Sequence, residues 1–99
     1  MIVMEMVWDG VTPEQYDEAR DVVGWEAEAP TGGILHVASF EGDQLRVTDV
    51  WESAEDFQRF VDDRLTPGVQ KVGITGEPQV VIRRAHRIFS PLMTPSARS

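Results

Sequence analysis

The chain has 99 residues, the size of one small domain with a modest core. It carries 9 basic and 17 acidic residues, a net charge of −8, and no cysteine. Nucleic acids and anionic membranes are bound through basic surfaces, so this charge argues against both as partners. The lack of cysteine excludes disulfides and thiolate metal sites.

The first residues, "MIVMEMVW", lack the basic leader of a signal peptide. No apolar run approaches the roughly 18 residues that a membrane-spanning helix needs. We therefore expect a cytoplasmic protein.

The N-terminal part of the chain predicts a strand followed by a helix. Residues 2 to 8 alternate with the period of two that is typical of a strand. Thr12 precedes Pro13, and Gln15 occupies the reciprocal position of a capping box, which predicts a helix start. This helix is expected to run to about Val23, before a loop over residues 26 to 33.

The second part predicts a hairpin, a helix and a last strand. Two β-rich runs, 34 to 40 and 44 to 51, are joined by Gly42-Asp43, which suits a type II′ turn. Ser53 is a good N-cap for the next helix, which Pro67 and Gly68 are expected to interrupt before a short turn through Val69 and Val72 resumes it. The last strand is expected over about residues 79 to 89.

This order of elements predicts an α+β protein with the ferredoxin-like βαββαβ arrangement, a four-stranded antiparallel sheet with both helices on one face. Residues 1 to 89 are expected to form the single domain, and residues 90 to 99 a flexible tail. The second face of the sheet would be apolar and uncovered. A second copy packed sheet against sheet would cover it, so we expect a homodimer.

The hairpin brings together the two polar residues of its strands. If Glu41 and Gln44 flank the turn, His36 lies directly opposite Asp49 on the same face, with the Cβ atoms within about 5.5 Å. A carboxylate beside an imidazole holds one tautomer and orients a general base. The same pair could instead be a purely structural one, and a register shift of one residue would separate the two.

Other candidates for the site are aromatic or come from the last strand. His86 shares strand parity with Arg84 and could be a third catalytic residue or a core histidine. The two histidines have no metal-ligand spacing, so no metal site is predicted. Aromatic side chains could line a small-molecule pocket, but each is also ordinary core material: Trp8, Tyr16, Trp25, Phe40, Trp51 and Phe60.

Three stretches carry a family resemblance: "GVTPEQYDEA", "VTDVWESAEDFQRFVDDRL" and "VVIRRAHRIF". On them the chain resembles the antibiotic-biosynthesis monooxygenases of the dimeric α+β barrel superfamily, and looks closest to actinobacterial members. The resemblance covers residues 1 to about 89. It implies a pocket between sheet and helices, and activities that range from cofactor-free oxygenases of aromatic polyketides to isomerases and heme-degrading enzymes.

The heme-degrading branch of that superfamily can be tested on the residues. Its members carry a tryptophan in the middle of the second helix and an axial histidine about ten residues later. Here the corresponding position is Phe60, and "VDDRLTPGVQKVG" contains no histidine. The missing axial ligand argues against heme chemistry.

Two kinds of function follow. The first is a cofactor-free monooxygenase, or an isomerase or cyclase, acting on an aromatic or polyketide-like molecule with His36 and Asp49 as the base. The second is a non-catalytic ligand-binding or accessory dimeric module, which needs the pocket but no base.

Overall fold

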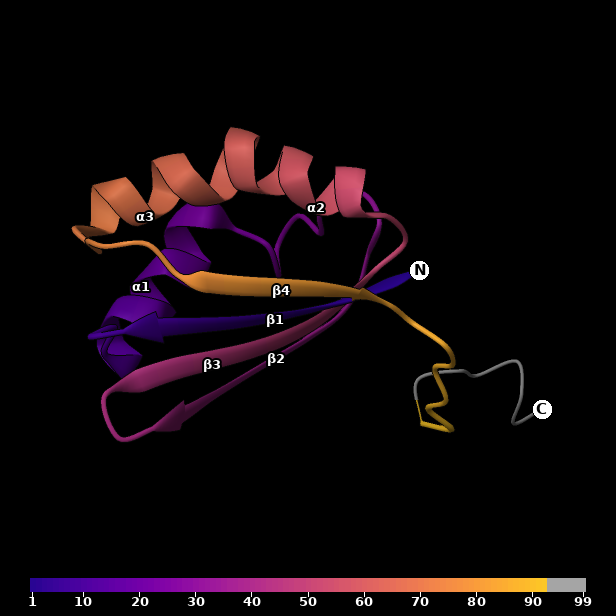
Figure 1. The fold of residues 1–99 in the computed structure, drawn as a ribbon. Helices are drawn as coiled ribbons and strands as arrows, with labels where there is room; N and C mark the ends of the chain where they lie inside the picture. Colours follow the sequence, from indigo (N-terminus) through magenta and orange to yellow (C-terminus); the bar gives the residue numbers. More distant parts are fainter. Residues whose placement is uncertain (93–99) are drawn as a thin grey trace.

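The computed structural model describes residues 1–92. A four-stranded antiparallel sheet carries all helices on one face, as the sequence predicted (Figure 1). The spatial order of the strands is β2-β3-β1-β4. The elements in chain order are β1 (Ile2–Asp9), α1 (Pro13–Val23), β2 (Gly33–Glu41), β3 (Gln44–Trp51), α2 (Ala54–Phe60), the π-helical turn η1 (Val61–Leu65), α3 (Thr66–Val72) and β4 (Gln79–Arg84).

The register of the β2–β3 hairpin is the predicted one. Glu41 pairs with Gln44 at the turn, and His36 pairs with Asp49. Gly42 has φ of 60°, and among residues 1–92 only glycines have positive φ, which fits a type II′ turn. A bulge between Gly33 and Leu35 shifts the register only at the far end of the hairpin.

Helix α1 begins and ends where its capping residues predict. Thr12 accepts a hydrogen bond from the Gln15 backbone, and the Gln15 side chain accepts one from the Thr12 backbone, which completes the capping box. Gly24 ends the helix in the left-handed conformation with φ of 76°.

The predicted interruption of the second helix at Pro67 and Gly68 is wrong. Helices α2 and α3 are joined through η1 into one continuous helical segment over the sheet (Figure 1). At the end of η1 the Thr66 amide donates to the Val61 carbonyl, five residues back. This wider turn comes directly before Pro67, in the first turn of α3, and lets the helix continue past a residue that has no N–H to donate. Gly68 allows close packing on α1, because a Cβ there would lie 2.3 Å from Cγ2 of Val23.

The last strand is shorter than predicted. It ends at Arg84, which pairs with Ile2 at the start of β1. One more hydrogen bond follows, from the Ala85 amide to the Met1 carbonyl. Residues 85–92 then leave the sheet (Figure 1). Most of the predicted tail, residues 93–99, lies outside the described residues.

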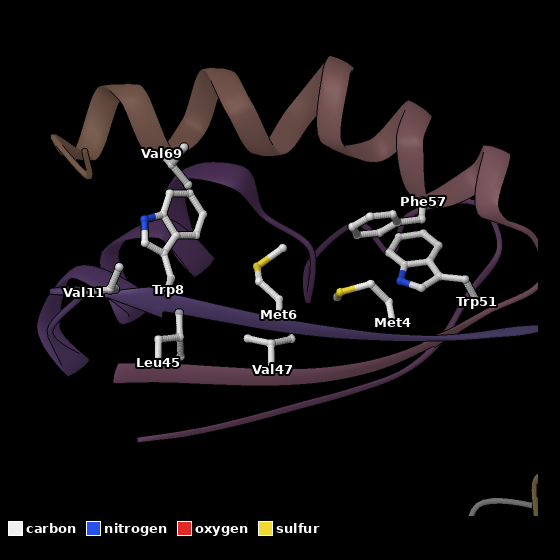
Figure 2. Close-up of a cluster of buried hydrophobic side chains, with 9 residues drawn as sticks. All are labelled: Met4, Met6, Trp8, Val11, Leu45, Val47, Trp51, Phe57 and Val69. Carbon is white, nitrogen blue, oxygen red and sulfur yellow. The ribbon is translucent and has the colours of Figure 1, made fainter. Parts of the chain in front are cut away.

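The core lies between the sheet and the helices (Figure 2). Val69 of α3 packs over Trp8 at one end of the sheet, and Phe57 of α2 packs on Trp51 at the other, with ring centroids 5.5 Å apart. Met6 lies between these two groups (Figure 2).

The opposite face of the sheet is not covered by any described element. Val37 and Val81 are 51% and 44% exposed there. Arg83 forms an ion pair with Glu5 across the same face, at 3.1 Å. Within residues 1–92, no helix is long and apolar enough to span a membrane.

Candidate functional site

A cavity of about 310 Å³ lies between the sheet and the helices. Its size is at the lower end of the range for small-molecule pockets. Its walls are mostly apolar side chains of β1, β3 and the helical segment, among them Met4, Met6, Trp8, Leu45, Val47, Phe57, Phe60, Leu65, Val69 and Ile74. Polar side chains of the lining include Tyr16, Glu26, His36 and Asp49.

Four of the lining residues form a hydrogen-bonded chain. Nδ1 of His36 lies 2.7 Å from Oδ1 of Asp49, and Nε2 of the same ring lies 2.7 Å from the Tyr16 hydroxyl. Trp51 donates its indole N–H to the other carboxylate oxygen, Oδ2 of Asp49, at 3.1 Å. The chain therefore runs from α1 through β2 to β3.

Burial differs along this chain. The Asp49 side chain is 9% exposed, whereas the His36 side chain is 33% exposed. A buried carboxylate is costly unless hydrogen bonds satisfy it, and here His36 and Trp51 supply one to each oxygen. The imidazole is thus held between a buried acceptor and a phenol nearer the surface.

Aromatic side chains hold the Tyr16 and His36 rings in place. The two ring planes are parallel to within 1°. Trp25 contacts both, with centroids 5.6 Å from Tyr16 and 5.4 Å from His36. Phe40 packs edge-on against Tyr16 at 6.3 Å.

The electrostatic surroundings favour the neutral form of Tyr16. Burial raises the pKa of its phenol, and the negative charges of Glu26 and Asp49 raise it further. Arg20 acts in the opposite direction and is a smaller cause. Tyr16 is therefore a phenol at neutral pH, able to donate a hydrogen bond.

Most of the aromatic residues that were predicted for the pocket line the cavity. Trp8 and Phe60 line the cavity, but Trp8 donates its indole N–H to the Thr75 carbonyl at 3.1 Å, so its contribution to the wall is apolar. Phe40 is outside the lining and reaches the site only through Tyr16.

The structure does not bring His86 to the cavity. It is exposed and lies two residues beyond the end of β4. Its predicted strand parity with Arg84 depended on a strand continuing to residue 89, and the strand ends at Arg84.

The loop after α1 supplies Trp25, one of the predicted aromatic candidates, and Glu26, which the sequence did not single out for the site. Both line the cavity, and the indole Nε1 of Trp25 is buried without a hydrogen-bond partner among residues 1–92. The Arg64 guanidinium fixes this loop by donating to the carbonyls of Val23, Gly24 and Glu28 at 2.7 to 3.2 Å. The loop sequence alone showed no periodicity that would orient Trp25.

Metal-ligating side chains do not cluster in the described part of the chain. No group of three or more His, Asp or Glu side chains within residues 1–92 is arranged to hold a metal ion. What the cavity offers is an apolar wall with one hydrogen-bonded acid–base group at its side.

Comparison with known proteins identifies the fold. No family model matches the sequence, and no curated protein matches it. Among solved structures, SnoaB, a cofactor-independent oxygenase from Streptomyces nogalater, is 11% identical with a TM-score of 0.63, over 88% of this chain and 93% of that one. An antibiotic biosynthesis monooxygenase is 14% identical with a TM-score of 0.62, over 88% and 100% of the two chains. NE2512 of Nitrosomonas europaea, of unknown function, is 13% identical with a TM-score of 0.64, over 91% and 93%.

The chain therefore has the ferredoxin-like fold of the antibiotic biosynthesis monooxygenase structures. At identities this low the likeness establishes the fold alone, and the chemistry has to be argued from the site.

Proposed function

We propose that the protein is a cofactor-independent monooxygenase of a neutral aromatic or polyketide-like hydroxy compound. The observation that carries this proposal is the His36–Asp49 pair at 2.7 Å, placed in the wall of an apolar cavity. The Asp49 carboxylate accepts the Nδ1 proton and so leaves Nε2 as the basic nitrogen. The fold shared with SnoaB, a cofactor-independent oxygenase, supports the same reaction class.

The base would remove the hydroxyl proton of the substrate. The resulting phenolate or enolate is electron-rich enough at its ring carbon to react with O₂ directly. One oxygen atom forms a new bond to that carbon, and the other leaves as water with the two hydrogens that the substrate loses. The substrate is oxidised from a hydroxyarene to a quinone, and O₂ is the oxidant.

The charges of the lining favour an uncharged ligand. Its described residues include the acids Glu26 and Asp49 and no lysine or arginine. A carboxylate or phosphate would lose its hydration in this cavity without gaining a cationic partner. A fused aromatic hydroxy compound, by contrast, would bury its rings against Met4, Met6 and Trp8.

A second candidate is a non-catalytic ligand-binding module. It is favoured by one observation: Nε2 of His36 already has a partner, the Tyr16 hydroxyl at 2.7 Å. In that case the hydrogen-bonded chain is structural and the cavity only binds. An isomerase or cyclase would begin with the same proton abstraction as the oxygenase, but it would consume no oxygen.

A homodimer through the open sheet faces belongs to the same proposal. Val37, Val81 and the other apolar residues of that face would be buried by a second copy related by a two-fold axis. We also propose that residues 1 to 89 form the single domain and that the protein is of actinobacterial origin.

Oxygen uptake with a panel of naphthols, anthrones and hydroxylated polyketides tests the function. We expect one O₂ consumed per quinone formed. His36→Ala and Asp49→Asn should each reduce turnover by roughly 100-fold or more, the usual scale of lost general-base catalysis. Glu18→Gln, at an exposed position of α1, is the control. Ligand binding without oxygen uptake would instead support the binding module. Loss of turnover in His86→Ala, with His36→Ala unaffected, would assign the base to the C-terminal segment.

A further inference from the structure

Both ring nitrogens of His36 are engaged in the structure. Nδ1 faces Asp49 and Nε2 faces the Tyr16 hydroxyl, each at 2.7 Å. The nitrogen that would act as the base is therefore covered by a phenol. A substrate must either displace Tyr16 or transfer its proton through it.

The hydrogen-bond donors of this chain can be assigned. Asp49 accepts from Trp51 through Oδ2 and from His36 through Oδ1, so Nδ1 carries a proton. In the neutral imidazole Nε2 is then an acceptor, and the Tyr16 hydroxyl donates to it.

Tyr16 retains capacity for one more interaction. A phenol oxygen has acceptor capacity besides its single O–H. Within residues 1–92, the only hydrogen bond of the Tyr16 hydroxyl is the one with His36. Tyr16 lines the cavity, so a hydroxyl of a bound substrate could donate to its oxygen.

Displacement of Tyr16 is the less favourable route. Its ring is packed between Trp25 and Phe40, with centroids at 5.6 and 6.3 Å. Rotating it away would break both contacts and the bond to Nε2.

Resting on the proposed function, we infer that Tyr16 is the catalytic residue that touches the substrate hydroxyl and relays its proton to His36. The substrate O–H bond breaks, and its proton moves to the Tyr16 oxygen. In the same step the Tyr16 O–H bond breaks, and that proton moves to Nε2 of His36. The electron pair stays on the substrate oxygen, Tyr16 is neutral before and after, and the imidazolium faces the Asp49 carboxylate.

Such a concerted relay fits the surroundings of Tyr16. A free tyrosinate beside Glu26 and Asp49 would be unfavourable, and the burial that raises the pKa of Tyr16 acts against it further. The relay never forms a free tyrosinate. Tyr16 transmits the basicity of His36 without becoming a base itself.

The variant Tyr16→Phe distinguishes a Tyr16 that relays the proton from a Tyr16 that only blocks access to Nε2. Phenylalanine keeps the ring and its contacts with Trp25 and Phe40 and removes only the hydroxyl. The relay predicts that kcat with a naphthol substrate falls roughly 100-fold or more, to the level of His36→Ala, while ligand affinity changes little. Turnover that is unchanged or faster would overturn it, because Nε2 would then act directly on the substrate.

A proton inventory on the unaltered protein gives a second readout. The rate is measured in mixtures of H₂O and D₂O. Two protons moving in one step predict a curved dependence on the deuterium fraction, and a linear dependence would overturn the relay. Absence of oxygen uptake by the unaltered protein would instead overturn the proposed function, whereas retained turnover in His36→Ala would overturn the assignment of His36 as the base and, with it, the relay. Loss in His36→Ala with none in Tyr16→Phe would overturn only the relay.

Discussion

Trp51 donates its indole N–H to Oδ2 of Asp49, two residues earlier on the same strand, at 3.1 Å. Both residues are buried, at 3% and 7% exposure. The bond occupies one carboxylate oxygen and leaves the other for His36. Trp51 is therefore a positioning residue: it acts on the imidazole through the carboxylate that it orients.

Trp51→Phe should weaken both stability and catalysis. Removing a hydrogen bond to a charged acceptor costs about 1.5 to 3 kcal/mol, and loss of ring volume in the core adds to that. We expect urea unfolding to show this loss, with kcat reduced and KM little changed. Trp8→Phe is the matched comparison, because Trp8 donates to the neutral carbonyl of Thr75 and not to Asp49. Equal effects of the two changes on kcat would argue against the positioning role.

Tyr16 should make stability depend on pH in the alkaline range. Its pKa in the folded state is raised above the ordinary value of 10.0, chiefly by burial. The folded protein thus holds this proton to higher pH than the unfolded chain does. The stabilisation is fully present below about pH 10 and is lost as pH rises through the folded value. Tyr16→Phe should remove this contribution to the loss of folding stability at alkaline pH.

The titration can be followed on one chromophore, because the sequence contains 1 tyrosine. The tyrosinate absorbance band should appear at higher pH in the folded protein than in urea. Glu26→Gln should shift the folded titration toward lower pH, since it removes a nearby negative charge. A titration identical in the folded and unfolded states would contradict the buried, acidic setting of Tyr16.

The open sheet face should mediate dimerisation. Sedimentation at micromolar concentration is expected to give about twice the 11.1 kDa mass of one chain. Val37→Lys should shift the equilibrium toward the monomer, because it would bury a charge between the two sheets. Val22→Lys, at a similarly exposed apolar position of α1, should leave the dimer intact. If the unaltered protein is a monomer, the proposal that a second copy covers the open sheet face is wrong.

Gly68→Ala should destabilise the protein by about 1 to 3 kcal/mol, the usual cost of overpacking. The new Cβ would lie 2.3 Å from Cγ2 of Val23, so α3 and α1 would have to move apart. Chemical unfolding measures the loss. Val23→Ala in the same chain should restore part of it by removing that methyl group. Gln70→Ala, at an exposed position of α3, is the control and should have little effect.

The sequence predicted the features that depend on local patterns. Alternation and the Gly42-Asp43 turn were enough to set the hairpin register, and with it the pairing of His36 and Asp49. Helix capping was likewise readable at Thr12 and Gly24.

The features that it did not predict depend on packing between elements. The contact of the Tyr16 hydroxyl with Nε2 of His36 requires the distance between α1 and the sheet, which no local pattern contains. Strand β4 ends at Arg84, opposite Ile2, so His86 lies beyond the paired residues and could not be placed from its own strand parity. Continuation of the helix through Pro67 required a π-helical turn, which sequence periodicity does not reveal.

That turn also keeps both ends of the helical segment facing the core. Phe57 and Val69 both point into the core, one at each end of the helical segment (Figure 2). In a regular α-helix of about 3.6 residues per turn, their spacing would leave them roughly a third of a turn apart. The wider π-helical turn, with its hydrogen bonds five residues apart, absorbs that excess. Its Val61 and Leu65 side chains are partly buried and pack against the same core. Deleting one residue from Val61–Leu65 should therefore convert the turn into regular α-helix and leave Val69 facing the core, because a spacing of eleven residues is about three full turns.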